Sequence, residues 1–145
     1  MEADYEQELL GFTGRERNYA VELSHVEEIC FDIKISKIPC LPRYFKGMFH
    51  YRGAILPVAQ LEETEEKDAK RRKVLLVLGC NGYRLGVLIP GEPYVVSYDE
   101  LKRIEHPAEP ELSEVWKIQG IFKASRGLTF LLDVEKTVEA MVIYQ

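Results

Sequence analysis

The sequence has few of the residues that build metal sites, disulfide frameworks or nucleophilic active sites. Its 145 residues include three histidines and three cysteines, widely spaced along the chain at Cys30, Cys40 and Cys80. The sequence has no C-x-x-C pair, and its cysteines, histidines and acids do not group at the spacing of a zinc site or a catalytic triad. We therefore predict three buried or half-buried thiols, no metal, no cofactor and no enzymatic activity.

Phosphate-binding features are also missing from the sequence. Neither a G-x-x-x-x-G-K-[ST] loop nor a G-x-G-x-x-G loop occurs, so no motif for cradling a nucleotide phosphate is present. Lysine and arginine number 19 against 24 aspartates and glutamates, which gives a formal net charge of −5. Because this charge has the same sign as a phosphate backbone, we expect no nucleic-acid partner.

Apolar runs stay well short of the roughly 20 residues that a membrane-spanning helix needs. The acidic, polar first residues, MEADYEQE, are the reverse of a secretory signal peptide's charged-then-apolar order. These observations predict a soluble, cytosolic protein that does not insert into a membrane. With 46% apolar residues, a chain of this length matches one ordinary domain with a real core.

Three β-hairpins are the clearest local predictions. In KVLLVLGCNGYRLGVLI, two β runs meet at Asn81-Gly82, the pair that best tolerates the positive φ angles of a type I′ turn. The runs GMFHY and AILPVAQL flank Arg52-Gly53 in the same way, and IQGIFKA and LTFLLDV flank residues 125–127. Pro57 lies inside one of these runs and cannot donate a ladder hydrogen bond, which predicts an edge, a bulge or a strand end there.

Other segments give less regular patterns. Apolar residues at period two predict a half-buried strand over residues 18–24. Residues 62–73 are charged throughout, which favours a solvated loop over a short helix, and residues 97–115 carry two prolines and predict turns and loop. Near the C-terminus, Asp133 is suited to cap a helix, and three apolar residues follow it at helical spacing: Val134, Val138 and Met141.

The chain also contains a weak internal repeat. The triplet that begins at Gly47 returns as a similar triplet at Gly120, and each is followed by Arg-Gly and a strand. The alternating pattern that begins at Tyr19 returns at Tyr83. Both offsets are close to half the chain. The repeat predicts two small β-barrels built on one plan and sharing a core, with chance similarity as the alternative.

Five motifs in order resemble the CheW family of bacterial chemotaxis coupling proteins. They are Y-A-V-E-L-x-x-V-E-E-I, P-x-L-P-x-Y-F-K-G-M-F-H-Y-R-G-A-I-L-P-V, G-Y-R-L-G-V, Q-G-I-F-K and L-L-D-V-E-K, and they span about residues 5–141. The resemblance implies a mainly β domain of two five-stranded SH3-like barrels. Together with the predicted short C-terminal helix, this gives one domain over residues 1–145, with barrel subdomains roughly at 15–75 and 76–135.

The resemblance also implies a function and a set of site residues. CheW-like proteins are adaptors that couple the cytoplasmic tips of methyl-accepting chemoreceptors to the regulatory domain of the histidine kinase CheA. Arg52 matches the arginine of the family's N-L-R-G motif at the receptor-binding face. By the same matching, Val26, Glu28 and Gly47 are receptor-binding candidates, and Glu28 and Lys46 are kinase-contact candidates.

Each assignment has a structural alternative. The arginine–glycine pair is also an ordinary turn, and Val26 is equally an ordinary core valine. Glu27 matches no family role and is expected to be solvated, whereas Phe45 and Ile29 are expected in the core. Arg126 matches no family position, so it is interpreted as a turn residue.

The sequence departs from the family at several positions. Gln60 stands where the family has an aspartate, and His50-Tyr51 stands where it has Asn-Leu. Pro90 and Pro93 interrupt a stretch that is a regular strand pattern in the family, which predicts an altered surface on the second barrel. These departures leave open a divergent CheW-like module with another signalling partner. A small β-barrel enzyme or ligand-binding protein is a more distant alternative.

Overall fold

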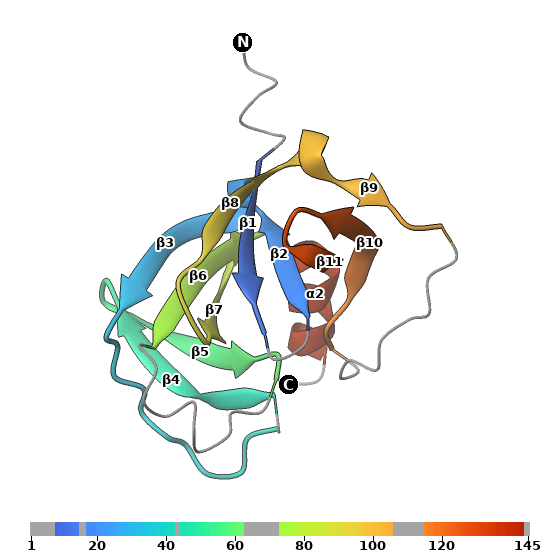
Figure 1. The fold of residues 1–145 in the computed structure, drawn as a ribbon. Coiled ribbons are helices and arrows are strands. Elements are labelled where there is room, and N and C mark those ends of the chain that lie inside the picture. The colour runs from blue at the N-terminus through green and yellow to red at the C-terminus, as the bar shows by residue number, and fades with distance from the viewer. Residues whose placement is uncertain (1–7, 15–16, 43, 63–72, 106–114, 144–145) are drawn as a thin grey trace.

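The computed structural model describes residues 8–14, 17–42, 44–62, 73–105 and 115–143. Its chain forms two β-sheets and a short C-terminal helix (Figure 1), which confirms the predicted mainly β class. The central sheet has the order β3-β6-β7-β5-β4 and contains β3 (Val26–Phe31), β4 (Phe45–Tyr51), β5 (Ala54–Gln60), β6 (Val74–Cys80) and β7 (Tyr83–Ile89). The terminal sheet has the order β8-β1-β2-β11-β10-β9 and contains β1 (Glu8–Thr13), β2 (Asn18–Glu22), β8 (Tyr94–Ser97), β9 (Lys102–Arg103), β10 (Ile118–Ala124) and β11 (Gly127–Leu132).

The two sheets are built on one pairing plan. Along β3-β6-β7-β5-β4 the successive pairs are antiparallel, antiparallel, parallel and antiparallel. The series β8-β1-β2-β11-β10 has the same sequence of directions. Both hairpins of the repeat, β4-β5 and β10-β11, shift register just before a glycine, at Gly47 and Gly120. The glycine repeat seen in the sequence is therefore a repeat of structure.

The second alignment of the repeat is corrected by the strand pairing. Opposite the two repeat glycines lie Val58 and Leu131, which pair across a parallel register with Gly86 and Ala20. Gly86 and Ala20 therefore occupy equivalent positions in the two sheets. Tyr19, which precedes Ala20, is thus equivalent to Leu85 and not to Tyr83, as the sequence pattern had predicted.

The boundary expected between residues 75 and 76 does not match the strand pairing. The central sheet takes its strands from residues 26–89, and the terminal sheet takes them from residues 8–22 and 94–132. The division is different because β6 pairs with β3, whereas β1 and β2 pair with strands from near the other end of the chain. Each sheet is a unit in space, but only the central one is contiguous in sequence.

The predicted turns and the helix cap are present. Asn81 and Gly82 join β6 to β7 with φ angles of 51° and 83°, the pair of positive values that this turn requires. Residues 125 and 126 join β10 to β11. α2 (Val134–Ile143) follows Asp133, whose Oδ1 accepts a hydrogen bond from the Lys136 amide at 2.9 Å.

The core lies mainly between the two sheets and α2. The largest buried cluster draws on both sheets, and the three apolar residues predicted for the helix, Val134, Val138 and Met141, are part of it. Phe45 is buried in this cluster and Ile29 packs against it, as expected. The prediction for the thiols was partly wrong: Cys30 and Cys80 are half-buried, but Cys40 is exposed.

Several local predictions need correction or refinement. The strand expected over residues 18–24 ends at Glu22, and a 3₁₀ turn, η1 (Leu23–His25), follows it. The strand, β2, is buried on both faces rather than half-buried as expected. Tyr19 lies in the main core cluster, and Ala20, on the opposite face, packs into a second cluster. The edge or strand end predicted at Pro57 was wrong: Pro57 lies inside β5, which is flanked by β7 and β4. It is tolerated there because the parallel pairing with β7 begins one residue later, at Val58.

The segment with two prolines connects the two sheets. β7 ends at Ile89 in the central sheet and β8 begins at Tyr94 in the terminal sheet, so Pro90 and Pro93 lie in the crossover between them. Farther on, a 3₁₀ turn, η3 (Tyr98–Glu100), precedes β9. Residues 63–72 of the loop predicted over 62–73, and residues 106–114 of the loop predicted over 97–115, lie outside the described residues. After β8, the described part of the second segment is turn and loop except for the two-residue strand β9 (Lys102–Arg103).

Candidate functional site

The β4-β5 turn places an exposed arginine beside strand β3. Arg52 and Gly53 have φ angles of 48° and 79°, so the Arg-Gly pair makes the same kind of turn as Asn-Gly. The Arg52 side chain is 72% exposed, and its Nη2 lies 2.7 Å from Glu28 Oε1. The structure therefore brings together two residues that the sequence analysis assigned to one surface from well-separated motifs.

Glu28 is the shared acceptor of this site. The Tyr51 hydroxyl and the Cys30 thiol each lie 3.4 Å from one of its carboxylate oxygens. Hydrogen bonding from Arg52, followed by that from Cys30, lowers the pKa of Glu28 below its ordinary value. Burial, followed by the neighbouring Glu28, raises the pKa of Cys30 to about 11. At neutral pH the carboxylate is therefore charged and the thiol is protonated, so Cys30 is a poor nucleophile.

A second ion pair, which the sequence pattern did not predict, adjoins the first. The Arg84 Nε lies 2.9 Å from Glu27 Oε2, which corrects the expectation that Glu27 is merely solvated. The Tyr51 ring connects the pairs, because its centroid lies 5.4 Å from Arg52 Cζ and 5.8 Å from Arg84 Cζ. We call these five residues, Glu27, Glu28, Tyr51, Arg52 and Arg84, the Arg52 cluster.

A β-bulge explains how consecutive glutamates reach two different arginines. The pairing of β3 with β6 shifts register between Val26 and Glu28, which leaves Glu27 as the extra residue. Gly79 on the neighbouring strand leaves the space that the Glu27 carboxylate occupies. The only sequence signal for this arrangement is a glycine in a strand opposite two acids, which is too general to predict an ion pair between residues so distant in the chain.

The other predicted site residues have different environments. Val26 is half-buried and packs against the main core, as an ordinary core valine would. Lys46 is exposed, in the register shift of β4. Gly47 is buried with a φ of 151°, and a Cβ there would collide with the carbonyl oxygen of Ser36. The close approach that Gly47 permits is therefore made by the protein's own chain.

That approach closes the central sheet. Ser36, in the segment after β3, forms an isolated antiparallel bridge with Met48 of the edge strand β4. Its two backbone hydrogen bonds measure 2.9 and 2.8 Å. The chain that continues from the edge strand β3 thus meets the opposite edge strand β4 beside Gly47, in agreement with the expected barrel.

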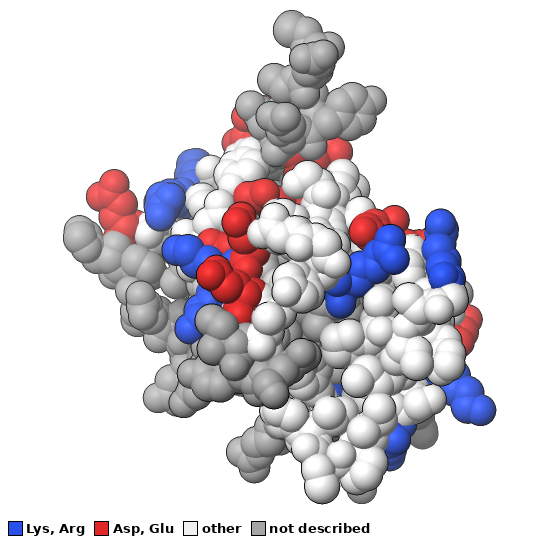
Figure 2. Space-filling view, turned by 180° about the vertical axis from the view of Figure 1, so that it is seen from behind, with Lys and Arg blue, Asp and Glu red and all other residues white. Residues whose placement is uncertain are grey.

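Figure 2 shows charges of both signs on the described surface, with several acidic side chains grouped left of centre and basic side chains beside them. Within the described residues, no group of three histidine, cysteine or acidic side chains is placed to hold a metal ion. Those residues also include no helix long and apolar enough to cross a membrane.

Nearly all of the described chain matches a known family. A family model for the CheW-like domain matches residues 8–141. The chain belongs to the CheW family. Among curated relatives, the chemotaxis protein CheW of Treponema pallidum is 24% identical over 140 residues, covering 92% of this chain and 82% of that protein. The chemotaxis protein CheW of Klebsiella aerogenes is 23% identical over 137 residues, with the same coverage.

A solved CheW structure has the same fold. The scaffolding protein TtCheW from Thermoanaerobacter tengcongensis superposes with a TM-score of 0.69 and 19% sequence identity, covering 92% of each chain. At this identity the likeness concerns the fold alone. It agrees with the two-sheet architecture and the short C-terminal helix derived above.

Proposed function

We propose that this protein is a non-enzymatic adaptor of bacterial chemotaxis, which couples chemoreceptor tips to the regulatory domain of a CheA-type histidine kinase in the cytosol. The family match over residues 8–141 carries this proposal, and two curated relatives are named chemotaxis proteins. The protonated state of Cys30 favours no nucleophilic chemistry at the Arg52 cluster.

The Arg52 cluster supports a role in partner binding. Arg52 and Glu28 are receptor-contact candidates, and their exposed ion pair is weakly held in water, so a partner carboxylate can replace Glu28 at the guanidinium. Glu28 and Lys46 are the candidates for kinase contact, and both lie on the central sheet, Glu28 on β3 and Lys46 on β4. Val26 and Gly47, the other two receptor-binding candidates, lie on β3 and β4 of the same sheet.

Calorimetric titration tests the proposal directly. The purified protein is titrated with the regulatory domain of its own organism's CheA-type kinase and, separately, with a chemoreceptor tip hairpin. We expect saturable binding of both, and an affinity for the receptor at least about tenfold weaker in Arg52→Glu, because a reversed charge repels the same carboxylate. Lys123→Glu makes the same charge change at an exposed position of β10 and is the matched control.

Two results would count against this proposal. If neither partner produces heat with a sample shown to be folded, the chain serves a different signalling partner. If Arg52→Glu unfolds the protein, Arg52 is a structural residue and its assignment to a binding surface fails. The second result is not expected, because the turn is exposed.

A further inference from the structure

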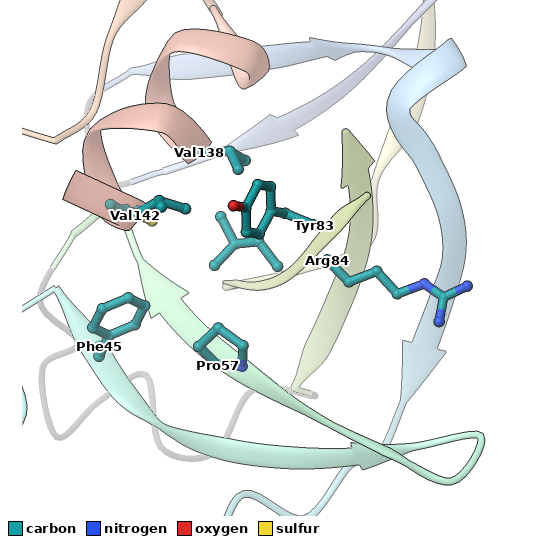
Figure 3. Close-up of a pocket in the computed structure, with 8 residues that line it drawn as sticks. Phe45, Pro57, Tyr83, Arg84, Val138 and Val142 are labelled. Carbon is teal, nitrogen blue, oxygen red and sulfur yellow. The ribbon is translucent and has the colours of Figure 1, made fainter. Parts of the chain in front are cut away.

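A pocket lies between the central sheet and α2, on the far side of Tyr83-Arg84 from β3. Its volume is about 140 Å³. Figure 3 shows Phe45, Pro57 and Tyr83 from the sheet and Val138 and Val142 from the helix converging on it. Its lining is mostly apolar, and neither the receptor nor the kinase role proposed above assigns a function to it.

The structural repeat explains why this space is open. Pro57 and Leu85 line the pocket. They lie one residue before Val58 and Gly86, whose equivalents in the terminal sheet are Leu131 and Ala20. The residues at the same places in the terminal sheet are Phe130 and Tyr19. Proline and leucine thus occupy, in the central sheet, the positions that hold two aromatic rings in the terminal sheet.

Those two rings fill the corresponding region of the terminal sheet. The Tyr19 and Phe130 centroids lie 6.0 Å apart, and their residues are only 1% and 3% exposed. Phe12 stacks on Tyr19 with a centroid separation of 5.6 Å. The pocket in the central sheet therefore has the place and the character of an absent aromatic ring.

The size of the pocket fits one such ring. An engineered apolar cavity of about 150 Å³ in another protein stays dry and binds benzene. Tyr83, at the pocket, is 52% exposed, so an incoming ring also finds an aromatic surface to stack on. A partner that inserts one ring here would complete the packing that the terminal sheet achieves with its own residues.

Arg84 adds a charge requirement. Its aliphatic part lines the pocket, while its guanidinium extends away from it toward β3, where it pairs with Glu27 (Figure 3). The Arg84 side chain is 46% exposed, so a carboxylate on a partner can approach the same group. This residue also links the pocket to the Arg52 cluster.

We propose that this pocket is a docking site for an aromatic side chain of a partner protein, flanked in the partner by a carboxylate that binds Arg84. The site goes beyond the proposed adaptor function. It lies at α2 and does not depend on which protein contacts Arg52.

Short peptides provide the probes. The ¹⁵N-labelled full chain is titrated by NMR with acetyl-Phe-Asp-amide, acetyl-Ala-Asp-amide and acetyl-Phe-Asn-amide. We expect saturable amide shifts at Phe45, Leu85 and Val142 with the first peptide. The Asn peptide should give a weaker apparent affinity, and the Ala peptide should give no saturable shifts around the pocket.

Two variants test the pocket itself. Val142→Phe places a ring of the protein's own into the space, and we expect it to weaken the Phe-Asp peptide at least about tenfold. Leu128→Phe adds the same ring at an exposed position of β11 and should bind like the wild type. If Val142→Phe does not fold, Leu85→Phe, on the sheet side, replaces it.

Several outcomes would overturn the inference. The pocket does not bind aromatic side chains if the Phe-Asp peptide shifts no pocket amides, or if the Ala peptide shifts them equally. The same holds if the filled variant binds the Phe-Asp peptide as tightly as Leu128→Phe does. Equal affinities for the Asp and Asn peptides would remove the role of Arg84. None of these results affects the calorimetric test with Arg52→Glu, so the two proposals fail separately.

Discussion

Replacing Gly47 with alanine is expected to lower the free energy of unfolding by about 3–5 kcal/mol. The φ of 151° costs a non-glycine residue about 1–3 kcal/mol. The new Cβ would also collide with the Ser36 carbonyl oxygen and lie 2.9 Å from Ile35 Cγ2. Ser36 can retreat only by breaking its two hydrogen bonds to Met48, each contributing about 1 kcal/mol.

Gly53→Ala is the matched control. Gly53 also has a positive φ, 79°, but a Cβ there would have no described atom within 4 Å. Gly53→Ala therefore lowers the free energy of unfolding only through backbone strain of about 1–2 kcal/mol. A less flexible unfolded chain offsets about 0.4–1 kcal/mol of this loss. The pair of variants therefore isolates the effect of closing the central sheet.

Urea unfolding measures both variants, and a thermal scan should show the midpoint of Gly47→Ala falling by about 10 °C. Equal losses in the two variants would refute the steric argument. A Gly47→Ala protein that keeps wild-type stability but loses receptor binding would assign Gly47 to partner contact, as the family resemblance implies.

Two further predictions concern titration and thiol reactivity. Because the folded-state pKa of Glu28 lies below its unfolded value, its contribution to stability is present above the unfolded pKa and is lost as pH falls through the folded one. In Arg52→Gln, carboxyl NMR should show the Glu28 pKa rising; an unchanged pKa would mean that Arg52 does not bind it. Since burial raises the Cys30 pKa to about 11, a disulfide reagent at pH 7.5 should label the exposed Cys40 well before Cys30. Equal rates, measured with the double variant Cys40→Ser/Cys80→Ser as the reference for Cys30, would contradict this.

The features that sequence predicted well are those that depend on near neighbours in the chain. Asn81-Gly82 and Arg52-Gly53 form turns because residues within a few positions determine their φ angles. Asp133 caps α2 through the amide of Lys136, in the first turn of the helix. Spacing between glycines also revealed the hairpin repeat, because both register shifts occur just before a glycine.

The features that sequence predicted poorly depend on pairing between distant strands. The barrel boundary was misplaced because β2 pairs with β11, and Asn18 Nδ2 donates to the distant Arg126 carbonyl at 2.9 Å. The alignment of Tyr19 with Tyr83 relied on two tyrosines, whereas the structural equivalence follows from cross-strand partners. Arg84 was missed because nothing near it in sequence indicates Glu27, which lies on a different strand.

The functional candidates lie where the two halves of the repeat differ. Glu28 pairs with Val77 and Tyr94 pairs with Gly11, so Glu28 and Tyr94 occupy equivalent positions in the two sheets. In each sheet an arginine from the following hairpin turn lies on that position. In the central sheet, Arg52 forms an ion pair with Glu28. In the terminal sheet, Arg126 Cζ lies 3.7 Å from the centroid of the Tyr94 ring.

The segments that follow the equivalent strands β5 and β11 also pack differently. Just after β5, Glu62 reaches the terminal sheet, where it accepts a hydrogen bond from the Tyr19 hydroxyl at 2.6 Å. Its carboxylate occupies the space that a Cβ on Gly14 would need. After β11, the chain continues as α2, which lies over the central sheet. The pocket stays open between this helix and the sheet. Because one plan produced both halves, packing alone does not require the exposed ion pair or the open pocket. The two proposals above therefore direct the search for partners to the central sheet rather than the terminal sheet.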